Sequence, residues 1–277
     1  MNPTLPNAAP LEAVDPLWHA LRQEAEDVAA RDPSMAAFVH DSILSHGCLE
    51  HAISHRIAGR LNHPMFDGGV IRRAFETMYE AEPGNAVALR VDLAAVYDRD
   101  PACNRFIEPA LYFKGFHAIQ TQRLSNWLYR AGREDFALYL QSRASEVFQV
   151  DIHPAVPMGR GIFIDHATGL VVGSTAVIED DVSILQNVTL GGTGKESGDR
   201  HPKIRRGVLI GAGAKILGNI EIGACSRVAA GSVVLAAVPP NTTVAGVPAK
   251  VVGRAGCAQP ARSMDHILAS GNGQEET

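Results

Sequence analysis

The 277-residue sequence lacks several features that define other classes of protein. No apolar run approaches the roughly 20 residues that span a bilayer, so no membrane-spanning helix is expected. The first ten residues, MNPTLPNAAP, hold neither a basic stretch nor an apolar stretch, which argues against a secretory signal. Basic residues are not in excess, because 25 Lys and Arg face 30 Asp and Glu. The resulting net charge of −5 is atypical of a nucleic-acid binder.

Cysteine is also scarce and scattered. Cys48, Cys103, Cys225 and Cys257 lie far apart and form no CxxC pair. A disulfide framework and a zinc site are therefore both disfavoured, and the expected location is cytoplasmic. The sequence has no HExxH motif and no carboxylate-rich ligand set, so no metal is expected.

Residues 15–149 carry a helical pattern that follows a proline-rich, loose arm over 1–14. Apolar residues recur at spacings of three and four, and a pair of helices joined near Gly132 is expected over 116–148. The chain should leave the helical path at Asp32-Pro33, His63-Pro64, Pro83-Gly84 and Asp100-Pro101. This half of the sequence predicts an all-α region of about six to eight helices.

A period of six residues replaces the helical pattern after Val150. Aliphatic residues recur in phase, with one step of eight residues (164 to 172) and one of fourteen (190 to 204). The positions are Ile152, Met158, Ile164, Val172, Ile178, Ile184, Leu190, Ile204, Ile210, Ile216, Ile222, Val228 and Val234. Four residues after most of them comes a small or aliphatic residue, such as Val156, Thr168 or Ala176. Such a repeat predicts a solenoid in which the first residue points inward and the second lies near a corner.

The expected fold is therefore α+β. An α-helical domain over 1–149 should precede a parallel β-helix over 150–253, followed by a flexible tail over 254–277. Three hexads close one triangular turn of about 18 residues, and stacked turns pair as parallel strands. An ordinary glycine-rich α/β domain is the alternative, which the long in-phase repeat disfavours.

Two segments interrupt the repeat and are candidates for function, because a regular prism has no cavity. In the first, His166 stands two places after inward-facing Ile164, so its side chain should face outward. Asp151 lies fifteen residues earlier, a little less than one turn, so the two side chains are expected to be near neighbours. A carboxylate that holds one ring nitrogen leaves the other free to take a proton from an alcohol. A surface histidine capping a corner is the alternative interpretation.

The second interruption is a loop over 191–203, rich in glycine and charge. Arg200 and His201 are candidates for binding an anion such as a carboxylate, although an Arg-His pair on a surface is often merely solvated. His153 precedes a proline and is expected to be structural. Together with His166 and His201 it leaves open a metal held between subunits, as in some hexapeptide-repeat hydratases. The GGTGK stretch is not a phosphate-binding P-loop, which requires GxxxxGK[ST] between a strand and a helix.

At these motifs the sequence closely resembles the bacterial serine O-acetyltransferase family. The resemblance covers roughly residues 15 to 253. It is carried by DIHP (151–154), DHATG (165–169), GGTGK (191–195), DRHPKI (199–204), IGAGAKILG (210–218) and AGVPA (245–249), and in the helical half by RDPA (99–102) and KGFHA (114–118). The hexapeptides alone indicate an acyltransferase, whereas DHATG and DRHPK together with the helical half are specific to the serine enzymes.

The resemblance implies a role for each matching residue. His166 matches the general base and Asp151 its dyad partner. Asp100 and Asp165 match the carboxylates that bind the serine amino group. Arg200 and His201 match residues that hold the serine carboxylate. The implied reaction transfers the acetyl group of acetyl-CoA directly to the hydroxyl of L-serine, the first step of cysteine biosynthesis, with L-cysteine as inhibitor.

The binding site for acetyl-CoA should lie along one side of the prism. Ala212 and Ala230 are 18 residues apart, so they should stack on successive turns and let a pantetheine arm approach the backbone. Gly192 and Thr193 should fall near the same side, and Lys250 is placed to reach a CoA phosphate. Plain corner packing is the alternative explanation for the small residues.

The resemblance also implies a left-handed β-helix, a homotrimer and its pairing into a dimer of trimers. Family members that dock into O-acetylserine sulfhydrylase end in isoleucine, whereas this sequence ends in Gln-Glu-Glu-Thr, which argues against that complex. One rival is a hexapeptide acyltransferase acting on a sugar or antibiotic, which would not need Asp100, Asp165 and Arg200 together. Another rival is a non-catalytic scaffold, which would need neither His166 nor Asp151. Homoserine is a further candidate acceptor, because one methylene changes binding by only about 1–3 kcal/mol.

Overall fold

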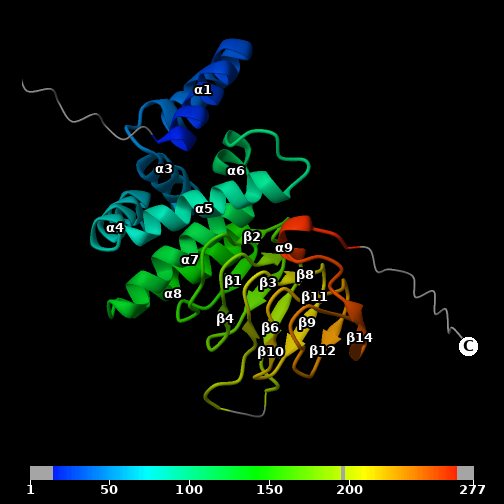
Figure 1. The fold of residues 1–277 in the computed structure, drawn as a ribbon. Helices are drawn as coiled ribbons and strands as arrows, with labels where there is room; N and C mark the ends of the chain where they lie inside the picture. The colour runs from blue at the N-terminus through cyan, green and yellow to red at the C-terminus, as the bar shows by residue number, and fades with distance from the viewer. Residues whose placement is uncertain (1–14, 195–196, 267–277) are drawn as a thin grey trace, which may run out of the picture.

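The computed structural model describes residues 15–194 and 197–266, a helical region followed by a prism of short parallel strands (Figure 1). The predicted arm over 1–14 and the C-terminal residues on which the sulfhydrylase prediction depends lie outside the described residues. The helical segments are α1 (Pro16–Arg31), η1 (Pro33–Met35), α2 (Ala36–Val39), η2 (His40–Leu44), α3 (Leu49–Leu61), α4 (Gly68–Ala81), α5 (Gly84–Arg99), α6 (Ile107–Leu111), α7 (Lys114–Arg130) and α8 (Glu134–Phe148). None of these is long and apolar enough to cross a membrane.

The predicted helix breaks are confirmed. α1 ends at Arg31, and the Asp32 carboxylate accepts a hydrogen bond from Ser34 N at 3.0 Å, which starts the next turn. α5 ends at Arg99, directly before Asp100-Pro101. α7 and α8 are joined through Gly132, whose φ of 75° favours glycine.

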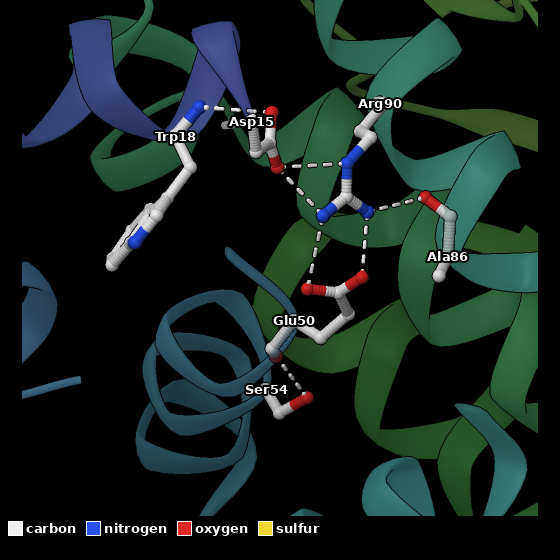
Figure 2. A network of polar contacts seen from close by, with 6 residues as sticks. All are labelled: Asp15, Trp18, Glu50, Ser54, Ala86 and Arg90. Carbon is white, nitrogen blue, oxygen red and sulfur yellow. Dashed lines mark hydrogen bonds and ion pairs between the residues drawn. The ribbon is translucent and has the colours of Figure 1, made fainter. Parts of the chain in front are cut away.

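Arg90 of α5 fixes the first helices of the bundle to one another (Figure 2). Its guanidinium donates to Asp15 Oδ2 at 2.7 Å and to Glu50 Oε1 at 2.6 Å. Asp15 also caps α1 by accepting from Trp18 N, and Glu50 lies in the first turn of α3. Because the half-buried guanidinium makes charge-assisted hydrogen bonds to both carboxylates, it fixes the positions of α1 and α3 relative to α5.

The prism has three faces, each a sheet of parallel strands. Its strands are β1 (Val150–Ile152), β2 (Phe163–Ile164), β3 (Leu170–Val172), β4 (Val177–Ile178), β5 (Ser183–Ile184), β6 (Thr189–Gly191), β7 (Lys203–Ile204), β8 (Leu209–Ile210), β9 (Lys215–Leu217), β10 (Glu221–Ile222), β11 (Arg227–Val228) and β12 (Val233–Val234). The first face is β1-β3-β6-β9-β12, the second is β4-β7-β10, and the third contains β2-β5-β8-β11. An antiparallel hairpin, β13 (Thr242–Gly246) and β14 (Ala249–Arg254), extends the third face.

The hexapeptide interpretation is confirmed in the positions that point inward. All thirteen aliphatic positions are buried except Met158, which is half-buried. The register steps follow the sequence: Val172 pairs with Leu190, whereas Ile152 pairs with Val172 across the eight-residue step and Leu190 with Ile216 across the long loop. The sequence alone therefore located both interruptions of the coil.

One predicted corner residue is wrong. Thr168 is exposed, and Ala167 takes the inner position with no exposed surface. The reason is the backbone of the eight-residue step, in which His166 and Ala167 have φ angles of 53° and 61°. These left-handed turns absorb the extra residues and shift the buried position by one.

The helical region is joined to the first coil of the prism through a fully buried carboxylate, Asp92 of α5. It accepts hydrogen bonds from the backbone N–H of Gly161 at 2.8 Å and of Ile162 at 3.0 Å. Arg123 and Gln120 of α7 donate to the same carboxylate, and Arg123 also donates to Gly159 O at 2.6 Å. Asp92 thus bonds both α7 and the first coil of the prism. Both side chains of its ion pair with Arg123 are buried.

A glycine allows the second close contact between the two parts. A Cβ on Gly115, in the first turn of α7, would lie 2.0 Å from Ile164 O at the end of β2. Only glycine permits α7 to approach the prism backbone this closely. The start of α7 is therefore held directly over the segment that contains His166.

The structure differs from the predicted flexible tail over 254–277 in its first part. Within residues 255–266, Ala255, Pro260 and Ala261 are buried, whereas most of the other residues are exposed. Helix α9 (Pro260–Ser263) contacts α5 and β8, and Ser183 Oγ donates to Ala261 O at 2.7 Å. The first part of the predicted tail is thus held to the prism by its buried alanines and by the hydrogen bond to Ala261 O. The composition of this segment did not reveal these contacts.

Asp92→Ala should lower the free energy of unfolding by about 3–5 kcal/mol, because it leaves the buried Arg123 charge and two backbone amides without their acceptor. The measurement is urea denaturation followed by circular dichroism. Glu82→Ala is the matched control: it removes an exposed ion pair with Arg130 in the same bundle and should cost less than about 1 kcal/mol. Equal losses in the two variants would contradict the importance of the buried junction.

Candidate active site

A cleft of about 630 Å³ lies where the helical region meets the prism. Three predicted site residues line it together, namely Asp100, Asp165 and His166. Asp100 follows α5, whereas Asp165 and His166 follow β2. The remaining wall is largely apolar and includes Val96, Tyr112, Phe113, Phe116, Phe163 and Ile164. The cleft combines two carboxylates, one imidazole and an apolar surface.

His166 faces outward, as the sequence predicted. Its side chain is 73% exposed, and its Nε2 lies 3.7 Å from Asp165 Oδ2. Ala167 beneath it is fully buried and anchors the loop to the prism. An exposed imidazole beside a carboxylate, on a loop anchored in the core, is suited to proton transfer with a ligand in the cleft.

The carboxylate of Asp165 is affected by burial and by its charged neighbours in the cleft. Burial raises the pKa of Asp165, and the like charge of Asp100 raises it further, whereas His166 and His266 lower it. Asp100 also accepts a hydrogen bond from Ala102 N at 2.9 Å. A cation placed between these carboxylates would relieve their repulsion, so the cleft favours an ammonium group at this point.

Asp151 occupies a different position in the single chain. It lies in β1 and pairs in register with Val171, on the outer side of the first face. Its Oδ1 accepts a hydrogen bond from Gln141 Nε2 at 2.7 Å. Over the described residues of one chain, no hydrogen bond joins Asp151 to His166, and the dyad stays a prediction.

His201 is buried at a different corner of the prism, between the first and second faces. Its Nδ1 lies 2.7 Å from Thr175 Oγ1, and a Cβ on Gly173 would lie 2.0 Å from its Nε2. Burial lowers the pKa of His201, and the nearby cations Arg200 and Lys203 lower it further. The lowered pKa favours the neutral imidazole, which can donate or accept a hydrogen bond.

Arg200 lies beside His201 on the same loop. Its backbone N–H donates to Thr175 Oγ1 at 3.0 Å, and its side chain packs against the backbone at Gly192. Thr175 therefore organises both residues of the predicted carboxylate site. Lys195 and Glu196 of this loop lie outside the described residues.

The predicted CoA residues lie in three places. Ala212 and Ala230 stack on the corner that carries His166, with Gly231 N donating to Ala212 O at 2.8 Å. Gly192 and Thr193 instead follow β6, on the corner that carries His201. Lys250 is exposed on β14, paired with Ala245.

The residues around His166 and those around His201 lie at opposite edges of the first face. The chain passes from the third face through His166 into β3, and from β6 through His201 into the second face. The His166 corner (residues 165–169) and the His201 corner (residues 199–202) are thus separated by the width of a face. A single chain does not place His166 beside Arg200.

Several residues of the cleft and loop were missed by reasoning from the sequence. Phe113 and Lys114 line the cleft, Thr175 orients His201, and Gln141 holds Asp151. The KGFHA motif was a signal for Lys114 but does not include Phe113, and nothing in the hexapeptide pattern distinguishes Thr175. Within residues 15–194 and 197–266, no group of three His, Cys, Asp or Glu side chains is arranged to hold a metal ion.

Comparisons with known proteins agree with the two-part architecture. The profile of the family described as serine acetyltransferase, N-terminal, matches residues 17–121, and that of the bacterial transferase hexapeptide (six repeats) matches residues 201–236. A serine acetyltransferase of Salmonella typhimurium is 53% identical over 256 residues, which cover 92% of this chain and 94% of the relative.

Solved structures show the same similarity. The serine acetyltransferase of Brucella abortus in complex with coenzyme A is 63% identical, with a TM-score of 0.88 over 90% of this chain and 100% of that chain. A serine acetyltransferase in complex with cysteine is 50% identical, with a TM-score of 0.89 over 91% of this chain and 98% of that one. Both halves of the chain are covered at high identity, and the chain belongs to the serine acetyltransferase family of enzymes.

Proposed function

We propose that this serine acetyltransferase transfers the acetyl group of acetyl-CoA directly to the hydroxyl of L-serine, giving O-acetyl-L-serine and CoA. The observation that carries the proposal is the cleft in which the exposed imidazole of His166 lies beside Asp100 and Asp165. The carboxylates receive the serine ammonium, and this places the hydroxyl near the imidazole. Such a site distinguishes an amino acid from a sugar, which carries no ammonium.

His166 acts as the general base. It takes the hydroxyl proton while the serine oxygen attacks the thioester carbonyl, and a tetrahedral oxyanion forms. Collapse of this intermediate breaks the carbon–sulfur bond, and the proton passes from the imidazolium to the CoA thiolate. Asp151 completes the dyad by stabilising the imidazolium. No cysteine lines the cleft among the described residues, which favours direct transfer over an acetyl-cysteine intermediate.

The site is completed by a second copy of the chain in a homotrimer. Arg200 and His201, which hold the serine carboxylate, lie at the other edge of the first face from His166. A neighbour related by rotation about a threefold axis brings its His201 corner to the His166 corner of the first chain. The same cleft then receives acetyl-CoA between Ala212 and Ala230 on one side and Gly192 and Thr193 on the other, with Lys250 near a phosphate.

Two further assignments rest on the relatives. Solved relatives contain CoA and cysteine, which supports acetyl-CoA as co-substrate and L-cysteine as a ligand of this chain. L-cysteine has the same ammonium and carboxylate as L-serine, so it fits the acceptor site and inhibits by occupying it. From the resemblance of the sequence to this family, we also propose that the helical regions pair two trimers into a hexamer.

His166→Ala should lower kcat by about 10²–10⁴-fold, the usual contribution of a general base. The measurement is CoA release with a thiol reagent, together with calorimetric titration of L-serine and acetyl-CoA. Both ligands should still bind the variant. Loss of binding along with activity would show that His166 has a structural role instead.

As the pH is lowered, the affinity for L-serine should begin to fall above pH ~4, where an ordinary aspartate is still charged. The reason is that Asp165, whose pKa is raised, takes up a proton at a higher pH and loses the charge that holds the ammonium. Asp100→Asn removes a like charge, lowers the pKa of Asp165 and should move this fall to lower pH. The dissociation constant is measured by titration, so that protonation of His166 does not enter through turnover. A fall that stays at the same pH would contradict the coupling.

Activity should reappear when two inactive variants, His166→Ala and Arg200→Ala, are unfolded together and refolded as mixed trimers. About a quarter of the shared clefts then combine an intact His166 with an intact Arg200 of the neighbour. Each variant refolded alone is the control. Mixed trimers with no more activity than the separate variants would show that one chain supplies both residues.

A further inference from the structure

The loop that carries His166 is held in a backbone shape that side chains disfavour. His166 and Ala167 have φ angles of 53° and 61°, and Gly169 follows with 77°. In this left-handed region Cβ crowds the backbone carbonyl, so two successive non-glycine residues need contacts elsewhere that hold them there. Ala167 provides one such contact, because it is fully buried and its carbonyl accepts from Leu170 N at 3.1 Å.

Lys114, the first residue of α7, provides a second contact from the helical region. Its ammonium donates to Thr168 Oγ1, inside the His166 loop, and to Gln149 Oε1 at 3.2 Å. Gln149 joins α8 to β1 and is itself left-handed, with a φ of 60°, and its carbonyl accepts from Gly169 N at 2.9 Å. One ammonium therefore ties three segments together at the point where the chain turns toward His166.

The position of Lys114 is itself fixed by the fold. Gly115 follows it and is pressed against Ile164 O, so the start of α7 cannot shift relative to the end of β2. The stem of Lys114 lines the same cleft as Asp165 and His166. The ammonium thus acts from a rigid element on a strained loop, which is the arrangement that holds a catalytic group in place.

We propose that Lys114 is a positioning residue for acetyl transfer: through Thr168 and Gln149 it holds residues 165–169 so that His166 presents its imidazole to the acceptor. This inference rests on the proposed role of His166 as general base. It gives the helical region a second task besides supplying Asp100, because α7 then governs the geometry of the base from a different domain.

Two variants test the contact from its two ends. Lys114→Met keeps most of the stem and removes the ammonium, and Thr168→Val keeps the shape and removes the hydroxyl. Each should lower kcat about tenfold, with little change in the KM of L-serine or acetyl-CoA and in the unfolding temperature. The double variant should lose less than the sum of the two single losses, because both changes remove the Lys114–Thr168 contact, although Lys114 also bonds Gln149 and Thr168 Oγ1 also donates to His166 O at 3.4 Å. Should Lys114→Met fail to fold, Thr168→Val still decides the question.

The pH profile of kcat/KM separates positioning from a direct effect of charge. If Lys114 positions His166, the variants should have a lower maximum of kcat/KM, and the fall of kcat/KM at acidic pH should occur at the same pH as in the wild type. Loss of a positive charge acting on His166 itself would raise the pKa of the imidazole and move that limb to higher pH, which would overturn the proposal. Additive losses in the double variant would overturn it as well.

Two further variants serve as references. Arg130→Met removes an exposed cation of the same helix, α7, that pairs with Glu82 far from the loop, and it should keep wild-type kcat. His166→Ala reports on the proposed function itself. If His166→Ala is inactive while Lys114→Met and Thr168→Val are unaffected, the positioning role is wrong and the general base stands. If His166→Ala is fully active, the proposed function fails and the inference fails with it.

Discussion

The buried carboxylate of Asp92 is the contact on which the functional arrangement depends. It binds two backbone amides of the first prism coil and the guanidinium of Arg123 at the same time. Because a buried carboxylate must satisfy its charge within the protein, these partners are fixed in one geometry. The junction in turn places the end of α5, with Asp100, and the start of α7, with Lys114, over the loop of His166. Most of the residues that line the cleft therefore belong to a region that has no part in the repeat.

The repeat was readable from the sequence because its physical cause is strict. Each coil must bury an aliphatic side chain at the same angular position, so an error in register would leave such residues exposed. The eight-residue step was located in this way, but the path of the backbone through it was not. Thr168 was taken for the corner residue because counting cannot distinguish a left-handed turn at Ala167 from a regular one.

The candidate site was predictable only in part, for a geometric reason. Spacing along the chain tells which coil a residue belongs to, and the face follows from the hexad. It does not tell which residues meet across two copies of the chain. Asp151 appeared close to His166 on spacing, whereas in one chain it bonds Gln141 on the outer side of the first face. Asp100 and Lys114 stand outside the repeat. The resemblance gave a role only to Asp100, and although the KGFHA motif includes Lys114, only the fold shows what its ammonium contacts.

The proposed acceptor site joins the His166 corner of one chain to the His201 corner of its neighbour. The most direct measurement is a crystal structure of this chain with L-serine and CoA bound. We expect a trimer in which the serine ammonium contacts Asp100 and Asp165 of one subunit and the serine carboxylate contacts Arg200 of the next. L-serine bound wholly within one subunit, or away from His166, would contradict it.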